Sequence, residues 1–127
     1  MNARELSGST LAYMGDAVWS IYARSYLLEK GYTKAFDLQK RSEKIVSAKA
    51  QAKFFFALED FWTETEMEIF KRGRNFKSNS SPKNTDVQTY HVSTGFEALI
   101  GYLYLNKEEE RLEQIWDKVR TLLEEES

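Results

Sequence analysis

Apolar residues recur at steps of three and four along most of the 127-residue chain. This period places side chains on one face of an α-helix, whereas a half-buried β-strand needs a period of two. The chain has one proline and no cysteine, so few positions interrupt helices, and neither disulfides nor thiolate-held metals can replace a hydrophobic core. The sequence therefore predicts an all-α fold, and its length without internal repeats predicts a single domain over residues 1–127.

Capping and turn residues predict where these helices begin and end. Ser9 or Thr10 can cap a first helix that ends at Gly31. Thr63 and Glu66 form a capping-box pattern before a short helix that ends near residue 73. We further expect one bent helix or two over 33–58, a loop over 75–89, a buried helix over 96–105, and a last amphipathic helix capped by Asn106. Periodicity alone also allows a buried strand over 96–105, but its Ala and Leu content favours a helix.

Charge is unevenly distributed, although 18 basic and 20 acidic residues give a net charge of only -2. Five basic residues and no acid lie between residues 71 and 83, whereas eight acids and four basic residues lie between 106 and the end. No segment resembles a signal peptide or a membrane span. We therefore expect a cytoplasmic protein without a membrane partner, and a nucleic-acid partner only through local positive charge.

Two acidic residues stand in strongly apolar helical segments. Asp16 directly follows Gly15, and Glu97 precedes Gly101 by one helical turn. A carboxylate among apolar side chains needs a cation or a hydrogen-bond donor, and small neighbours let two helices approach closely, which could bring the two acids together. Two carboxylate oxygens, completed by water and phosphate, would suit Mg²⁺. The alternative is that each acid faces solvent or pairs with Arg24 or a lysine.

Several segments resemble motifs of the ribonuclease III family. Leu11–Val18, with its Gly-Asp-Ala sequence, resembles the signature helix of that family, and Phe96–Leu105 resembles its second conserved helix. Residues 71–75, 82–90 and 93–98 resemble more narrowly the Mini-ribonuclease III branch, a bacterial form without an appended double-stranded-RNA-binding domain. The resemblance extends from about residue 11 to residue 111.

This resemblance implies an all-helical, homodimeric endoribonuclease that cleaves double-stranded RNA and matures the ends of the 23S ribosomal RNA precursor. It implies Mg²⁺ as cofactor, with Mn²⁺ as a substitute, and Asp16 and Glu97 as catalytic metal ligands. Products would carry 5′ phosphate and 3′ hydroxyl groups, and a ribosomal protein bound to the substrate is a further expected partner. Ala12 and Thr94 replace two other acids of the family motifs, so the number of metal ions stays open. The alternative function is a non-catalytic helical scaffold that binds RNA or the ribosome.

Basic side chains of the catalytic domain must then supply the phosphate contacts, because no separate RNA-binding domain is expected. The expected RNA-binding residues are Arg72, Arg74, Lys77 and Lys83, together with Lys49 and Lys53 from the preceding segment. For the last two lysines, a solvated helix face is the other interpretation. The aromatic residues Trp19, Tyr22, Tyr26, Trp62 and Trp116 are expected in the core or at the dimer contact.

Overall fold

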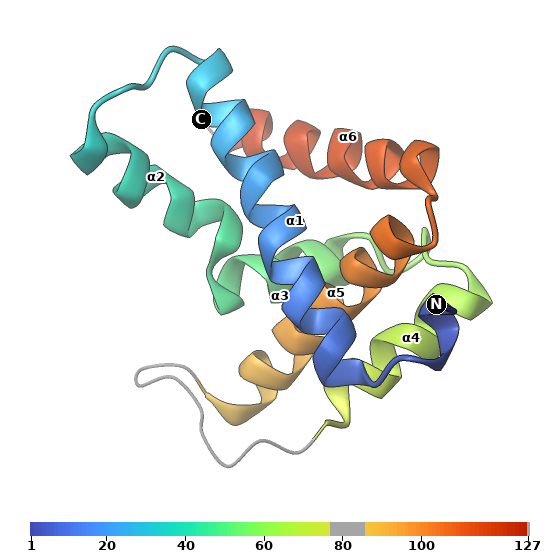
Figure 1. Ribbon diagram of the computed structural model, residues 1–127. Coiled ribbons are helices and arrows are strands. Elements are labelled where there is room, and N and C mark those ends of the chain that lie inside the picture. The colour runs from blue at the N-terminus through green and yellow to red at the C-terminus, as the bar shows by residue number, and fades with distance from the viewer. Residues whose placement is uncertain (77–85, 127) are drawn as a thin grey trace.

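The computed structural model describes residues 1–76 and 86–126, and this part of the chain is helical with no β-strand. The elements are a short 3-10 helix, η1 (Ala3–Glu5), and the α-helices α1 (Gly8–Glu29), α2 (Ala35–Val46), α3 (Ala48–Ala57), α4 (Glu64–Arg74), α5 (Val87–Leu105) and α6 (Glu109–Glu125) (Figure 1). The predicted all-α fold is confirmed. None of the described helices is long and apolar enough to cross a membrane.

Helix α5 is the centre of the fold. Ten of its 19 residues are buried, so it is apolar nearly all round, as expected for a helix enclosed by others. Helices α1, α3 and α4 all pack against it. Helix α6 crosses behind the upper part of α1 (Figure 1), and its buried side chains Leu112, Ile115 and Trp116 close the core.

The N-cap of α1 lies two residues before Ser9, the earlier of the two expected caps. Ser7, rather than Ser9 or Thr10, is the N-cap, because its hydroxyl accepts the backbone N–H of Thr10 at 3.2 Å. The helix ends at Glu29, and Gly31 follows with a φ of 97°. This left-handed conformation is the one that glycine adopts without strain, so the predicted stop is confirmed.

The segment over 33–58 is two helices that meet at Ser47. Ser47 is both the C-cap of α2 and the N-cap of α3. Its hydroxyl accepts the backbone N–H of Ala50 at 3.1 Å. The capping box before α4 is present as predicted, with Thr63 and Glu66 each accepting the other's backbone N–H.

Two predicted boundaries near α5 are wrong. The loop expected over 75–89 is shorter at its end, because Asp86 caps α5 by accepting both the N–H and the hydroxyl of Thr89. Asn106 does not cap the last helix; it ends α5, and its side-chain amide donates to Glu108 instead. Helix α6 therefore begins at Glu109, without a side-chain cap.

An aromatic cluster joins α1, α2, α5 and α6 in the core. Trp19 packs edge-on against Phe96 and Trp116, with ring centroids 4.9 and 5.4 Å away, and its indole N–H donates to the backbone oxygen of Ile45 at 2.9 Å. Trp19 and Trp116 are both buried within the chain. For these two residues the expected place in the core is confirmed.

Candidate active site

Two glycines allow α1 and α5 to touch backbone against backbone. A Cβ atom built on Gly15 would lie 1.7 Å from the backbone oxygen of Glu97, and one built on Gly101 would lie 1.9 Å from that of Leu11. Real Cβ atoms essentially never come that close, so only glycine fits at either position. The crossing places Asp16 of α1 beside Glu97 of α5.

At this crossing the carboxyl group of Asp16 is close enough to that of Glu97 to disfavour the ionised form of Glu97. Burial, the hydrogen bond to Asp16 and the negative charge of Asp16 together raise the pKa of Glu97 to about 8, and burial is the largest cause. Glu97 therefore holds a proton at neutral pH, because burial removes water from its charged form and the nearby Asp16 carboxylate resists a second negative charge. Asp16 itself lies on the exposed side of α1, so the pair opens toward solvent.

A third side chain, Gln51 of α3, completes the group. Its amide N–H₂ donates to Oε2 of Glu97 at 3.3 Å, which favours the ionised carboxylate and lowers the pKa of Glu97. Sequence reasoning missed Gln51, since a single neutral amide in an Ala-rich helix has no local pattern that distinguishes it from a surface residue.

The donor set of this site suits a hard divalent cation. A cation between Asp16 and Glu97 would take the place of the proton on Glu97, and carboxylate oxygens are ligands that Mg²⁺ prefers. Within residues 1–76 and 86–126, no cluster of three or more Asp, Glu or His side chains is arranged to hold a metal. The Thr94 hydroxyl donates to the backbone oxygen of Tyr90 at 3.1 Å and keeps its lone pairs. Most of a cation's remaining ligands would thus be water or substrate oxygens.

The two arginines expected to bind RNA make contacts within the protein. Arg72 donates to the backbone oxygens of Arg4, within η1, and of Leu6, its C-cap. Arg74 donates to the side chain of Asn75 at 3.2 Å, and its guanidinium lies 5.7 Å from the ring centroid of Phe70. Both arginines therefore stabilise the fold around α4, whatever they contribute to RNA binding.

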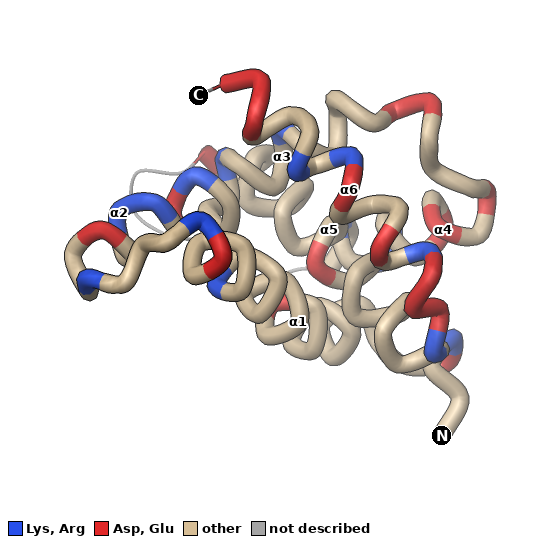
Figure 2. The backbone as a smooth tube through the Cα atoms, turned by 90° about the horizontal axis from the view of Figure 1, so that it is seen from above, with Lys and Arg blue, Asp and Glu red and all other residues tan. Residues whose placement is uncertain are grey.

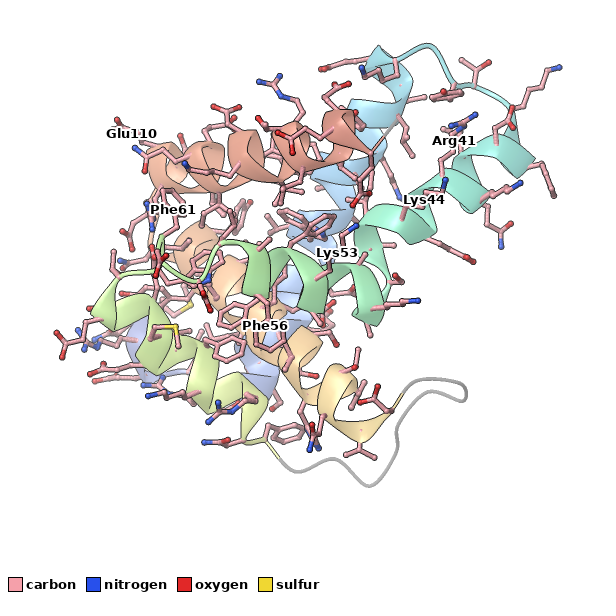
Figure 3. The ribbon with its side chains drawn as sticks, turned by 180° about the vertical axis from the view of Figure 1, so that it is seen from behind. Arg41, Lys44, Lys53, Phe56, Phe61 and Glu110 are labelled. Atoms are coloured by element: carbon pink, nitrogen blue, oxygen red, sulfur yellow. The ribbon has the colours of Figure 1, made fainter. Side chains whose placement is uncertain are left out.

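The lysines expected to bind RNA are placed differently from one another. Lys49 is exposed on α3, and Lys53, one turn later, forms an ion pair with Glu126 beyond the end of α6 (Figure 3). Lys77 and Lys83 lie outside the described residues. Helix α3 carries two basic residues and no acid, and acids outnumber basic residues on α6 (Figure 2). The acidic stretch predicted from residue 106 thus lies on α6, whereas much of the basic segment predicted over 71–83 lies outside the described residues.

Comparison with known proteins identifies the class to which this fold and site belong. The Ribonuclease III domain matches residues 9–108, which include Asp16 and Glu97. A solved crystal structure of a protein from Fusobacterium nucleatum superposes with a TM-score of 0.83 at 33% identity, covering 98% of this chain and 97% of that one. The chain belongs to the ribonuclease III family and is an endoribonuclease.

Similar proteins of known name indicate which branch of the family the chain resembles. Mini-ribonuclease 3 of Staphylococcus aureus is 51% identical over 122 residues, which cover 94% of this chain and 91% of the relative. Mini-ribonuclease 3 of Clostridium tetani is 44% identical over 125 residues, covering 98% and 83%. The resemblance to the Mini-ribonuclease III branch is thus confirmed over nearly the whole chain.

Proposed function

We propose that this endoribonuclease cleaves double-stranded RNA with Mg²⁺, and that Asp16 and Glu97 are its catalytic metal ligands. The observation that carries the proposal is the carboxyl pair at the glycine crossing of α1 and α5. A cation bound by the pair would displace the proton on Glu97 and offset the negative charge of both carboxylates. A structural role alone would not favour two adjacent acids at a partly exposed helix crossing.

The residues of the site would divide the work as follows. Asp16 and Glu97 would hold the cation, and Glu97 would give up its proton when the cation binds. Bound there, Mg²⁺ would supply a Lewis acid for the phosphodiester and a nucleophilic water at neutral pH. The exposed side of Asp16 would face the RNA backbone, and the rigid glycine crossing would keep both carboxylates in register with the scissile phosphate. Hydrolysis would leave 5′ phosphate and 3′ hydroxyl ends.

We propose that precursor 23S ribosomal RNA is the substrate, with a ribosomal protein as a further partner on it, and that the enzyme works in the cytoplasm. The names of the relatives support a ribonuclease, and the resemblance to the Mini-ribonuclease III branch supports this particular RNA. Mn²⁺ is proposed as a substitute for Mg²⁺, because it accepts the same oxygen ligands.

A homodimer is part of the proposal, and the outer face of α1 supports it. Tyr13, Ile21 and Leu28 are 78%, 65% and 55% exposed along this helix. Such a row of large apolar side chains is typical of a surface that another protein covers. Tyr13 lies three residues from Asp16, so a second subunit on this face would sit beside the carboxyl pair and align two sites for the two strands of a duplex.

The direct test replaces each acid by its amide. Asp16→Asn and Glu97→Gln should each lower Mg²⁺-dependent cleavage of a labelled 23S-precursor duplex by at least about 10²-fold, because each removes a metal ligand. Asp117→Asn, an exposed acid on α6, is the matched control and should cleave normally. Unchanged cleavage by Asp16→Asn would refute the metal-ligand assignment. Binding of the duplex by the wild-type protein without any strand scission in Mg²⁺ would favour the scaffold alternative.

The RNA-binding residues are tested by salt dependence. If Lys49 contacts a phosphate, Lys49→Ala should reduce the slope of log affinity against log salt by about one. Lys53→Ala should act likewise, since Lys53 can exchange Glu126 for a phosphate. Lys118→Ala on α6 should leave the slope unchanged. An unchanged slope for both α3 variants would remove α3 from the RNA-binding surface.

A further inference from the structure

Gln51 is an unusual residue for its place in the core. It belongs to the first half of α3, it is 1% exposed, and it is one of only three buried polar or charged side chains among the described residues. Its amide N–H₂ donates to two acceptors, Oε2 of Glu97 at 3.3 Å and the backbone oxygen of Val46 at 3.2 Å. Gln51 thus connects the candidate site on α5 to the end of α2.

These two contacts fix which way the amide faces. The backbone oxygen of Val46 has no hydrogen to give, so the N–H₂ end of the amide faces it, and the same end meets Oε2 of Glu97. Turning the amide over would bring Oε1 against the Val46 oxygen and lose that hydrogen bond. The donor is therefore held toward Glu97 by the backbone of α2 as well as by Glu97 itself.

The other end of the amide has no partner. Within the part of the chain that the structure describes, Oε1 of Gln51 is the one buried side-chain oxygen or nitrogen without a hydrogen bond. An unpaired buried acceptor destabilises the folded state, and an unbranched apolar side chain of the same length would avoid that cost. Packing alone does not account for an amide here, so what the amide provides must come from its donor end.

The break between α2 and α3 orients the N–H₂ group of Gln51 toward Glu97. Ser47 ends α2 and begins α3, so α3 turns away from the direction of α2 and presents its buried face to α5. Gln51 lies one turn into α3 and reaches back to Val46 and across to Glu97 at the same time. In a continuous helix, the backbone oxygen of Val46 would accept the backbone N–H of Ala50. Here that N–H donates to the Ser47 hydroxyl instead, so the Val46 oxygen is available to Gln51.

From these observations we infer that Gln51 is a positioning residue, whose amide holds the Glu97 carboxylate in the orientation needed to bind a divalent cation together with Asp16. The inference rests on the proposed metal-dependent function and adds to it a side chain from a third helix. Gln51 would act through Glu97 and touch neither cation nor RNA. Ala12 and Thr94 replace two acids of the family motifs, so this site has fewer carboxylates than those motifs would give it. The orientation of each remaining carboxylate therefore matters more.

The test compares Gln51→Met with Ser47→Ala. Gln51→Met keeps the length and the buried volume of the side chain but removes the donor, whereas Ser47→Ala loosens the same α2–α3 break and leaves the amide in place. The primary measurement is Mn²⁺ binding to the RNA-free protein, followed by the electron paramagnetic resonance of the free ion. The second is the Mg²⁺ concentration that gives half-maximal cleavage of a labelled duplex.

We expect Gln51→Met to weaken Mn²⁺ binding by about tenfold or more, the usual effect of removing a group that orients a ligand. The Mg²⁺ requirement for cleavage should rise by a similar factor, with a smaller change in rate at saturating Mg²⁺. Ser47→Ala should lower the unfolding temperature while leaving Mn²⁺ affinity within about twofold of wild type.

Three outcomes would overturn this inference. Wild-type Mn²⁺ affinity in a folded Gln51→Met protein would show that the amide does not position Glu97. Equal losses of affinity in both variants would assign Gln51 a purely structural role at the helix break. Absence of Mn²⁺ binding and of Mg²⁺-dependent cleavage in the wild-type protein would overturn the proposed function, and this inference with it, so the two failures are distinguishable.

Discussion

Replacing Gly15 by Ala should both destabilise the protein and disable the site, because the added methyl group has no room. The new Cβ would lie 1.7 Å from the Glu97 oxygen, whereas ordinary contact begins at 3.4 Å. The two helices would have to separate locally by roughly 1.7 Å. The obstructing atoms are backbone, on both Glu97 and Gly101, so they cannot rotate away as a flexible side chain would.

The magnitude follows from two opposing effects. Overpacking a core costs about 1–3 kcal/mol, and contact with backbone puts this case near the upper end. The higher helix propensity of alanine offsets about 1 kcal/mol of this overpacking cost. We therefore expect Gly15→Ala to lower the free energy of unfolding by about 2 kcal/mol and the Tm by about 6–12 °C for a chain of this length.

The effect on cleavage should be larger than the loss of stability explains. A displacement of about 1 Å between catalytic groups can lower a rate by about 10²-fold, and this substitution moves Asp16 relative to Glu97. Urea denaturation gives the stability, and cleavage of a labelled duplex well below the Tm, where the variant is fully folded, gives the activity.

Gly31→Ala provides the control. A Cβ there meets nothing within 4 Å, but the φ of 97° strains any other residue, at a cost of about 1 kcal/mol. This variant should lose stability and keep wild-type cleavage. A Gly15→Ala protein with wild-type stability and cleavage would refute the close helix crossing as the origin of the carboxyl pair.

Two further predictions concern buried charge. The pKa of Glu97 is about 8 in the folded protein, against 4.5 for the free side chain. Between these two pH values, Glu97 is protonated in the folded protein and ionised in the unfolded chain. The metal-free protein should therefore lose about 2 kcal/mol of stability as pH rises from about 5 to about 8, a figure reduced for the partial contact of Glu97 with water. Urea denaturation of Glu97→Gln in a chelator should show this pH dependence flattened, and an unchanged dependence would assign it to other groups. Arg111→Ala should lower the free energy of unfolding by about 3 kcal/mol, because Glu66, 4% exposed, accepts two hydrogen bonds from Arg111 and would remain buried without its partner. Arg120→Ala, which breaks an exposed ion pair, is its control and should cost less than about 0.5 kcal/mol; equal effects of the two would contradict the buried ion pair.

Local signals in the sequence predicted much of the fold. The capping box at Thr63 and Glu66 and the stop at Gly31 depend on residues within one turn of each other, and both are present as expected. The start of α5 was missed although Asp86 caps it three residues before Thr89. The polar run that precedes Asp86 hid this pattern, because capping residues and turn residues are the same residue types.

Contacts between distant segments account for what the sequence could not predict. Arg111 and Glu66 are 45 residues apart, and no local pattern pairs them. Arg72 follows Glu68 by four residues on the same helix, yet its guanidinium donates to the backbone oxygens of Arg4 and Leu6, more than 60 residues away in the sequence. Gln51 reaches Glu97 only because α3 packs against α5, and no local pattern predicts that packing. The small residues near Asp16 and Glu97 were the exception, since glycine beside an acid in an apolar segment indicates a close helix contact before any partner is known.

The most direct measurement of the central claim is the position of Mn²⁺ in the protein. Crystals soaked in Mn²⁺ and measured near its absorption edge give an anomalous difference map that locates the ion without reference to activity. We expect a peak with one oxygen of Asp16 and one of Glu97 at about 2.1–2.2 Å, and its other ligands from water. A fully occupied Mn²⁺ peak elsewhere, with no ion between the two carboxyl groups, would contradict the assignment of this pair as the metal site.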